Sequence, residues 1–365
     1  MRIKVGNFSV LTLTFAAFFL INLTGCSSKE DYSMDELSDS SHSLQIENIN
    51  SFLIEKKFQG SVLVAEKDKI ILAKGYGSCD EKNPESEPIT MNTTFEIGSI
   101  TKQFTAAAIL QLAEKKKLNL DDKLSLYFPD YQHGDKITIK MLLNMRSGLT
   151  DCLNATDTFF PKKIARQIDN NTYKNKPVEK DIILKYLNEA PLFIEPDSSY
   201  FYCNTNYYLL AKIIEQITGQ TYEAYLQENL FTPCKMFNTN TDFQNTDTKG
   251  YDWKNRYFSI PDDFSKGYGN INSSVIDLFK WTQKLVNTKI ISKQSYHQMI
   301  NTDSYGYGIN WQNGELFHAG ITNVFNSMSI YYPEEKITVI VLANQPVYVS
   351  NAASIARSIY DCYKN

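Results

Sequence analysis

A serine and a lysine stand three residues apart where a long apolar segment begins. In "FEIGSITKQFTAAAILQL", Ser99 and Lys102 precede a run that ends at Leu112. Residues i and i+3 share a face of a helix, so the lysine can reach back to the serine hydroxyl. A serine becomes a nucleophile only when a base takes its proton, and burial lowers the pKa of a lysine toward that use. Taken alone, the pair fits a helix cap beside a surface lysine better.

A second candidate group is Tyr202-Cys203-Asn204, which comes directly before a strongly helical segment. A phenol close to cations can transfer protons, and an amide two residues further on can hold a substrate carbonyl. In a loop, residues two apart can point the same way. In isolation, a core tyrosine and an asparagine N-cap describe these residues more simply.

The third group is His318-Ala319-Gly320, followed by Ile321, before a β-rich run. Alternate residues of a strand face one side, so His318 and Gly320 are expected to face together, and glycine lets a substrate approach the backbone. The N–H near Ile321 could join that of Ser99 in an oxyanion hole. A lone histidine in a turn is the simpler interpretation of His318 by itself. No two histidines of the chain have metal-ligand spacing, so we predict no metal and no cofactor.

The elements that must position these groups form an α+β pattern. Helical spacing at the beginning of the domain is followed by a hairpin, with apolar runs at 62–65 and 70–73. A long, mostly helical stretch follows, and two β-rich runs at 325–332 and 336–344 precede a last helix. Strands from both ends can join one antiparallel sheet flanked by helices, and the middle can form a mostly helical lobe. A cleft between the two is then expected.

The first residues of the chain indicate an export signal rather than a part of the folded domain. Residues 1–26 combine an early positive charge with the apolar run 10–23, which is shorter than the ~20 residues of a membrane span and typical of a signal peptide. Leu23-Thr24-Gly25-Cys26 resembles a bacterial lipobox, so Cys26 is the expected lipidation site; an ordinary secretory signal or an uncleaved anchor is the alternative. The acidic, Ser-rich residues 27–43 predict a flexible tether, and residues 44–365 the folded domain.

Composition limits the classes of partner. The 365 residues carry a net charge of −4 with dispersed basic residues, which argues against nucleic-acid binding. We therefore expect a small-molecule or peptide substrate, and membrane attachment only through the lipid anchor. The pairing of the scattered cysteines and the oligomeric state do not follow from the sequence.

Together the three groups resemble the pattern of the serine β-lactamase and penicillin-binding-protein superfamily, in its class C-like branch. That pattern is S-x-x-K, then Y-x-N, then K-T-G or H-x-G. The likeness extends to "ITIKMLLNMRSGL" and "YGYGINW", and covers the chain from about Ser51 to Ala343. The resemblance implies a β-lactamase/transpeptidase-like fold.

The resemblance also implies roles for the site residues. Ser99 would be the acylated nucleophile, and Lys102 and Tyr202 would share proton transfer. Asn204 would orient a substrate amide. His318 would stand where many relatives carry lysine, and would help to hold Tyr202 or a substrate carboxylate. The backbone amides of Ser99 and Ile321, beside Gly320, would form the oxyanion hole.

The sequence therefore predicts an exported, membrane-anchored serine hydrolase on the cell surface or periplasmic side. Its substrates would be D-alanyl peptides, β-lactams, or related esters and amides. A histidine binds a carboxylate less firmly than a lysine, which weakens the case for a dedicated β-lactamase. The alternative is a wall-binding lipoprotein with the same fold that is non-catalytic or senses penicillin.

Overall fold

The computed structural model describes residues 35–83, 85–153, 181–242, 245–251, 254, 262–301, 305–322 and 324–364. The predicted signal peptide, Cys26 and the first part of the predicted tether lie outside these residues. Within the described part of the chain, no helix combines the length and apolar character needed to cross a membrane.

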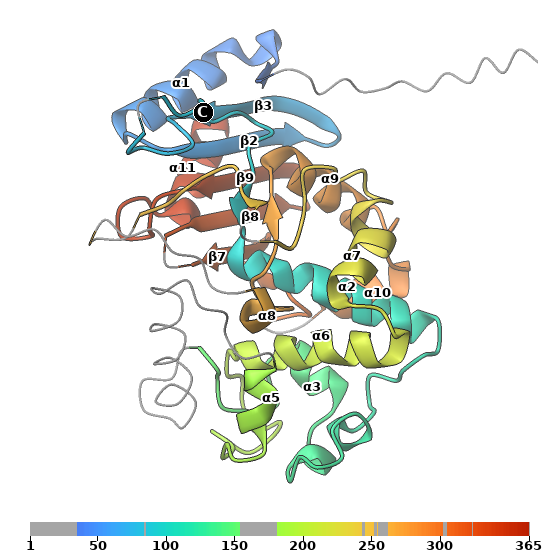
Figure 1. Ribbon diagram of the computed structural model, residues 1–365. Coiled ribbons are helices and arrows are strands. Elements are labelled where there is room, and N and C mark those ends of the chain that lie inside the picture. The colour runs from blue at the N-terminus through green and yellow to red at the C-terminus, as the bar shows by residue number, and fades with distance from the viewer. Residues whose placement is uncertain are drawn as a thin grey trace, which may run out of the picture. The chain divides into compact units, whose positions relative to one another are not determined.

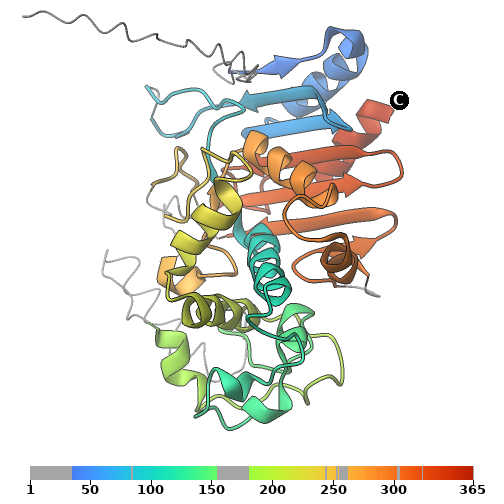
Figure 2. The ribbon, with the colours of Figure 1, turned by 90° about the vertical axis from the view of Figure 1, so that its right-hand side faces the viewer.

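A seven-stranded antiparallel sheet forms one half of the described structure, with the strand order β1-β3-β2-β9-β8-β7-β6 (Figures 1 and 2). Its strands are β1 (Leu37–Ser38), β2 (Gly60–Glu66), β3 (Lys69–Tyr76), β6 (Asn310–Gln312), β7 (Glu315–Ile321), β8 (Asn326–Tyr332) and β9 (Ile337–Ala343). The predicted hairpin is β2–β3, and both predicted C-terminal β-runs are strands, so the N-terminal and C-terminal strands do share one sheet. The pairing of β2 with β9 joins them.

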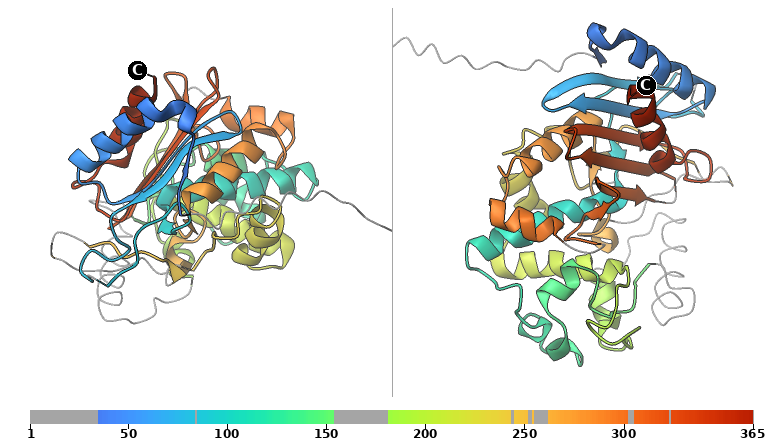
Figure 3. Two further views of the ribbon diagram at one scale, coloured as in Figure 1. Left: turned by 90° about the horizontal axis from the view of Figure 1, so that it is seen from above. Right: turned by 180° about the vertical axis from the view of Figure 1, so that it is seen from behind.

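Both faces of the sheet centre are covered. Helices α1 (Ser43–Glu55) and α11 (Ala352–Lys364) lie on one face, as Figure 3 shows from above. Helix α9 (Val275–Val286) lies on the other side, against β2 and β9. Every residue of β9 is buried, which explains why its sequence is a continuous apolar run rather than an alternating one.

The second half is the mostly helical lobe that the sequence predicts. It contains α2 (Thr101–Glu114), α3 (Ile139–Leu143), α5 (Ile182–Leu187), α6 (Asn204–Thr218), α7 (Tyr222–Leu226), the π-helical turn Gln227–Phe231 and α10 (Lys293–Ile300). The short helix α8 (Asp262–Ser265), the 3-10 turns and the small two-stranded sheet β4 (Phe95–Glu96) with β5 (Asn272–Ser273) complete the described elements. The predicted α+β fold is confirmed.

The fold begins earlier than residue 44. Leu37–Ser38 pairs with Ala73 and Leu72 of β3, and α1 starts at Ser43. This strand lies inside the segment whose composition predicts a tether. A two-residue edge strand needs only backbone hydrogen bonds, so a polar and acidic composition does not reveal it.

The cysteines of the described residues are all free thiols. Cys152, Cys203 and Cys234 are buried, and Cys79 and Cys362 are half-buried. The three buried thiols thus pack as small residues of the core.

Candidate active site

Helix α2 places Ser99 and Lys102 at its first turn. Ser99 lies in the 3-10 turn Gly98–Ile100, which leads directly into α2. The helix is buried along almost its whole length, with Phe104 stacked on Trp281 at a ring distance of 4.1 Å. Thr105 also donates a hydrogen bond to the Gly267 carbonyl at 2.6 Å. The position of the Ser-x-x-Lys pair is therefore fixed by core packing.

Lys102 is fully buried and close to three oxygen atoms. Its Nζ lies 2.9 Å from Ser99 Oγ, 2.8 Å from Asn204 Oδ1 and 3.0 Å from the Tyr268 carbonyl oxygen. The last two oxygens can only accept, so they take two N–H groups. The third position of a neutral amine is its lone pair, which then faces the Ser99 hydroxyl.

The charge state of Lys102 suits this arrangement. Burial lowers its pKa to about 7, against a smaller opposing effect of the Asp151 carboxylate. Near neutral pH a large share of the molecules thus carries an unprotonated amine beside Ser99. This is the state in which a lysine can take the serine proton.

Tyr202 reaches the same serine from the segment that precedes α6. Its hydroxyl donates to Ser99 Oγ at 2.9 Å, and its backbone lies in the segment before α6. That segment is held by the hydrogen bond from Phe201 N to the Met145 carbonyl. Burial raises the pKa of Tyr202 above its ordinary value, so the phenol is protonated in the resting site. The geometry therefore favours Lys102 as the resting base and Tyr202 as a proton donor.

Asn204 is the first residue of α6 and connects Lys102 to a buried carboxylate. Its Nδ2 donates to Asp151 Oδ2 at 3.1 Å, and its backbone N donates to the same oxygen at 2.5 Å. A carboxylate only accepts, so the amide nitrogen must face Asp151, and the amide oxygen then faces Lys102. Sequence reasoning missed Asp151. It directly follows "SGLT", but a single acidic residue in a loop gives no sign of its partner.

His318 and Tyr305 form a second pair that sequence reasoning did not foresee. His318 Nε2 lies 3.0 Å from the Tyr305 hydroxyl, and Nδ1 lies 2.7 Å from the Ala319 carbonyl. His318 is 3% exposed. Burial is the main reason why its pKa falls to about 3, with the Lys102 charge adding to the effect. Among the described contacts its side-chain partner is Tyr305. The resemblance had implied that His318 helps to hold Tyr202 or a substrate carboxylate, and the second of these roles remains a prediction.

Strand β7 brings Ile321 N to the edge of the site. Thr322 N donates to the Phe325 carbonyl, and Ile321 pairs with Asn326. Hydrogen-bonding direction alternates along an antiparallel strand, so the Ile321 N–H points away from β8. A Cβ added to Gly98 would lie 3.0 Å from this nitrogen, so β7 runs directly beside the turn that carries Ser99. Two backbone N–H groups, those of Ser99 and Ile321, can therefore face one oxyanion.

These groups open into one cleft of about 420 Å³. It is lined by residues of both lobes: Gly98, Ser99, Leu153, Tyr200, Tyr202, Asn204, Ser265, Tyr268, Gly269, Tyr305, Asn310, Phe317, His318, Ala319, Ile321 and Thr322. The structure thus brings together Ser99, Tyr202, Asn204, His318 and Ile321, with Lys102 beneath them. Gly320 lies against the turn at Ile97 rather than on the cleft wall.

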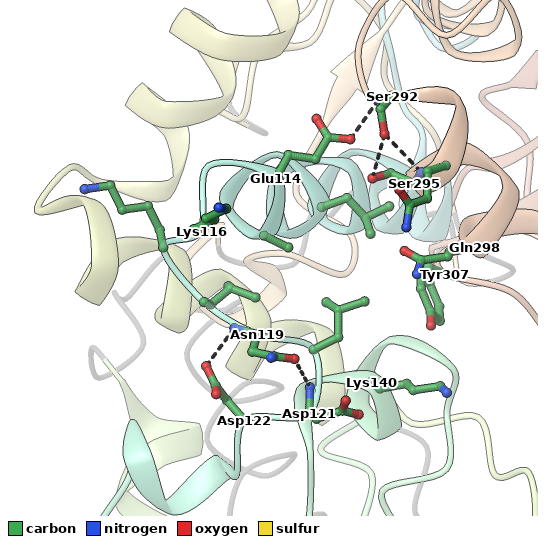
Figure 4. Close-up of a pocket in the computed structure, with 16 residues that line it drawn as sticks. Glu114, Lys116, Asn119, Asp121, Asp122, Lys140, Ser292, Ser295, Gln298 and Tyr307 are labelled. Atoms are coloured by element: carbon green, nitrogen blue, oxygen red, sulfur yellow. Dashed lines mark hydrogen bonds between the residues drawn. The ribbon is translucent and has the colours of Figure 1, made fainter.

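A larger cavity of about 780 Å³ lies elsewhere, between the end of α2 and α10 (Figure 4). Its labelled side chains include Glu114, Asn119, Asp121 and Tyr307. None of the predicted site residues lines it, and Glu114 is held there by the Ser292 backbone N at 2.7 Å. The chemistry predicted from the sequence belongs to the smaller cleft.

Comparisons with known proteins identify the family and agree with the fold. The family described as beta-lactamase matches residues 49–361. Penicillin-binding protein 4* of Bacillus subtilis (strain 168) is 29% identical over 79% of this chain and 68% of that protein. The crystal structure of FmtA from Staphylococcus aureus superposes with a TM-score of 0.73 at 24% identity, over 91% of both chains. D-amino acid amidase from Ochrobactrum anthropi SV3 has a TM-score of 0.72 at 19% identity, over 89% of this chain and 99% of that one. The last two likenesses concern the fold.

Proposed function

This chain belongs to the beta-lactamase family and is a serine hydrolase of that family, and we propose that it acts through an acyl-enzyme on Ser99. The observation that carries the proposal is the position of Ser99 Oγ, 2.9 Å from both Lys102 Nζ and the Tyr202 hydroxyl, in an open cleft. The proposed substrates are D-alanyl peptides, β-lactams, or related esters and amides.

Acylation follows from the hydrogen-bond pattern. The Lys102 amine takes the Ser99 proton, and Oγ attacks the acyl carbonyl. The N–H groups of Ser99 and Ile321 stabilise the oxyanion that forms. The Tyr202 hydroxyl, or the ammonium newly formed on Lys102, gives a proton to the leaving group.

Deacylation uses the same groups. A water molecule attacks the acyl carbonyl, the Lys102–Tyr202 pair takes its proton, and the pair returns a proton to Ser99 Oγ, which leaves as the hydroxyl. In this proposal Asn204 holds Lys102 in place through its amide oxygen. The Asn204 side chain also orients the substrate amide.

The proposal is tested by turnover of three substrates: a chromogenic cephalosporin, a D-alanyl dipeptide and a neutral p-nitrophenyl ester. We expect hydrolysis of at least one of them, and Ser99→Ala should lower its kcat by at least about a thousandfold. Equal turnover by Ser99→Ala and the wild-type protein would contradict an acyl-enzyme on Ser99. A durable penicillin adduct without turnover of any substrate would favour the penicillin-sensing alternative.

We also propose that the protein is exported and anchored by a lipid on Cys26. The apolar run 10–23 and the sequence Leu23-Thr24-Gly25-Cys26 support this. Fractionation of cells that express the full chain tests it. Cys26→Ser should move the protein out of the membrane fraction, and an unchanged distribution would contradict lipidation at this residue.

A further inference from the structure

We propose that Ser327 is a positioning residue for the oxyanion hole. Its hydroxyl holds the turn that carries Ser99 in a fixed place beside β7, so that the N–H groups of Ser99 and Ile321 face the same oxygen. This inference rests on the proposed function, because it takes the cleft at Ser99 as the site of acyl transfer. Ser327 is not among the described residues that line the cleft, so it acts through the turn and not on the substrate.

The two N–H groups of the hole come from separate parts of the chain. Ser99 lies in the 3-10 turn Gly98–Ile100, and Ile321 is the last residue of β7. Their relative position therefore depends on what joins the turn to the sheet. A misplacement of about 1 Å at a reacting centre can lower a rate about a hundredfold, so this junction matters for catalysis.

Ser327 makes this junction from β8, the strand beside β7 (Figure 1). It pairs with Gly320, and its hydroxyl donates to the Ile97 carbonyl at 2.8 Å. Directly paired residues point to the same face of a sheet. Gly320 has no side chain, and a Cβ there would lie 1.9 Å from the Ile97 oxygen and 2.4 Å from Ser327 Oγ. The hydroxyl thus reaches the turn through the space that Gly320 leaves open.

The other hydrogen bonds of Ile97 do not connect it to the sheet centre. Its carbonyl also accepts from Ile100 N at 3.3 Å, within the turn itself, and its own N donates to the Ile271 carbonyl at 3.0 Å. Ser327 is 2% exposed, so bulk water does not compete for its hydroxyl. Its second acceptor, the Gly320 carbonyl, is more distant at 3.4 Å. Among the described residues, Ser327 is therefore the donor that ties this carbonyl to the sheet.

Loss of the Ser327 hydroxyl should loosen the turn relative to β7 without unfolding it. The bonds of Ile97 to Ile100 and Ile271 remain, so the local fold is kept. The two N–H groups are then less precisely aligned, and they stabilise the oxyanion less. Binding of the uncharged ground state does not depend on this alignment, so the effect belongs to the chemical step.

The test measures burst acylation of Ser99 by a neutral p-nitrophenyl ester and by the matching thionoester, which has sulfur in place of the carbonyl oxygen. Sulfur accepts hydrogen bonds poorly, so the ratio of the two rate constants reports how well the N–H groups fit an oxyanion. Ser327→Ala should lower the rate constant of the oxygen ester about ten- to a hundredfold, and that of the thionoester less. The dissociation constant of the ester before acylation should change little.

Ser61→Ala is the matched control. Ser61 is a fully buried serine of β2, and its hydroxyl donates to the Thr90 carbonyl at 3.0 Å, with the Lys74 carbonyl at 3.4 Å. It makes the same kind of bond from sheet to loop as Ser327, and it is not among the described residues of the cleft. Both variants should lose a similar amount of thermal stability, and only Ser327→Ala should change the ratio of rate constants.

Ser327→Cys is a second variant, because a thiol can donate but does so weakly. Its ratio should lie between those of the wild-type protein and Ser327→Ala, and it takes the place of Ser327→Ala if that variant does not fold. The acidic limb of the acylation rate should keep its wild-type position in both, because neither change alters Lys102 or its three partners.

The outcomes decide between separate failures. An unchanged ratio in the Ser327 variants, an equal change in Ser61→Ala, or a shifted acidic limb overturns this inference while leaving the acyl-enzyme in place. Absence of Ser99-dependent acylation of the wild-type protein by either ester overturns the proposed function, and this inference with it.

Discussion

At the scale of single residues, the charge state of Lys102 depends on how Asn204 separates it from Asp151. The Asp151 carboxylate is 3% exposed and accepts from both nitrogens of Asn204. The amide stands between the negative charge and the amine, which lies 2.8 Å from Asn204 Oδ1. Asp151 therefore offsets only part of the effect of burial, and the pKa of Lys102 stays below its ordinary value. Direct contact with the carboxylate would instead keep the lysine protonated.

This balance predicts the pH dependence of acylation. The base form of Lys102 is lost as the pH falls through its pKa of about 7, so the acylation rate should fall there. Asp151→Asn removes a charge that raises this pKa, so its acidic limb should lie at lower pH. Stopped-flow measurement of the acylation rate, with a substrate that has no ionisable group, gives the acidic limb of the wild-type protein and that of Asp151→Asn. A rate independent of pH between 5 and 9 would contradict Lys102 as the base.

At the scale of elements, the site depends on the close approach of β7 to the turn that carries Ser99. A Cβ on Gly320 would lie 1.9 Å from the Ile97 carbonyl oxygen, far inside contact distance. Only glycine allows the strand to come this near. The same approach brings the Ile321 N–H beside Gly98, so one packing contact also assembles the proposed oxyanion hole.

Gly320→Ala should therefore damage stability and activity together. Forcing a methyl group into this contact costs about 1–3 kcal/mol and moves the Ile321 N–H away from Ser99. Gly314 provides the matched control, because it lies at the β6–β7 turn with φ +80° and has nothing within 4 Å of an added Cβ. Gly314→Ala should cost about 1–2 kcal/mol from its left-handed backbone alone and keep full kcat. Urea unfolding and kinetics measure both, and full activity in Gly320→Ala would refute the close-approach argument.

At the scale of the whole molecule, the sequence predicted the architecture well and the connections within the site less well. The hairpin at β2–β3 and the apolar run of β9 follow from local patterns, so the sheet could be foreseen. The pairing of His318 with Tyr305, and of Asn204 with Asp151, could not. These contacts join segments 13 and 53 residues apart, and they depend on hydrogen-bond geometry that only the folded chain creates.

The same holds for the first strand. Leu37–Ser38 adds to the sheet edge through backbone bonds that its polar neighbours conceal. By contrast, the N-cap of α9 is a local feature: Ser274 comes directly before Val275, and its side chain accepts from Asp277 N. Local capping chemistry is legible in a sequence because donor and acceptor are neighbours in the chain.

Acylation of Ser99 can be measured by intact-mass spectrometry of an acid-quenched reaction with a neutral activated ester. A neutral ester is used so that the reagent brings no charge of its own to the cleft. The wild-type protein and Ser51→Ala, which alters an exposed serine on α1, should each gain the mass of one acyl group. Ser99→Ala should gain none. An equal adduct on Ser99→Ala, or no adduct on the wild-type protein, would contradict acylation of Ser99.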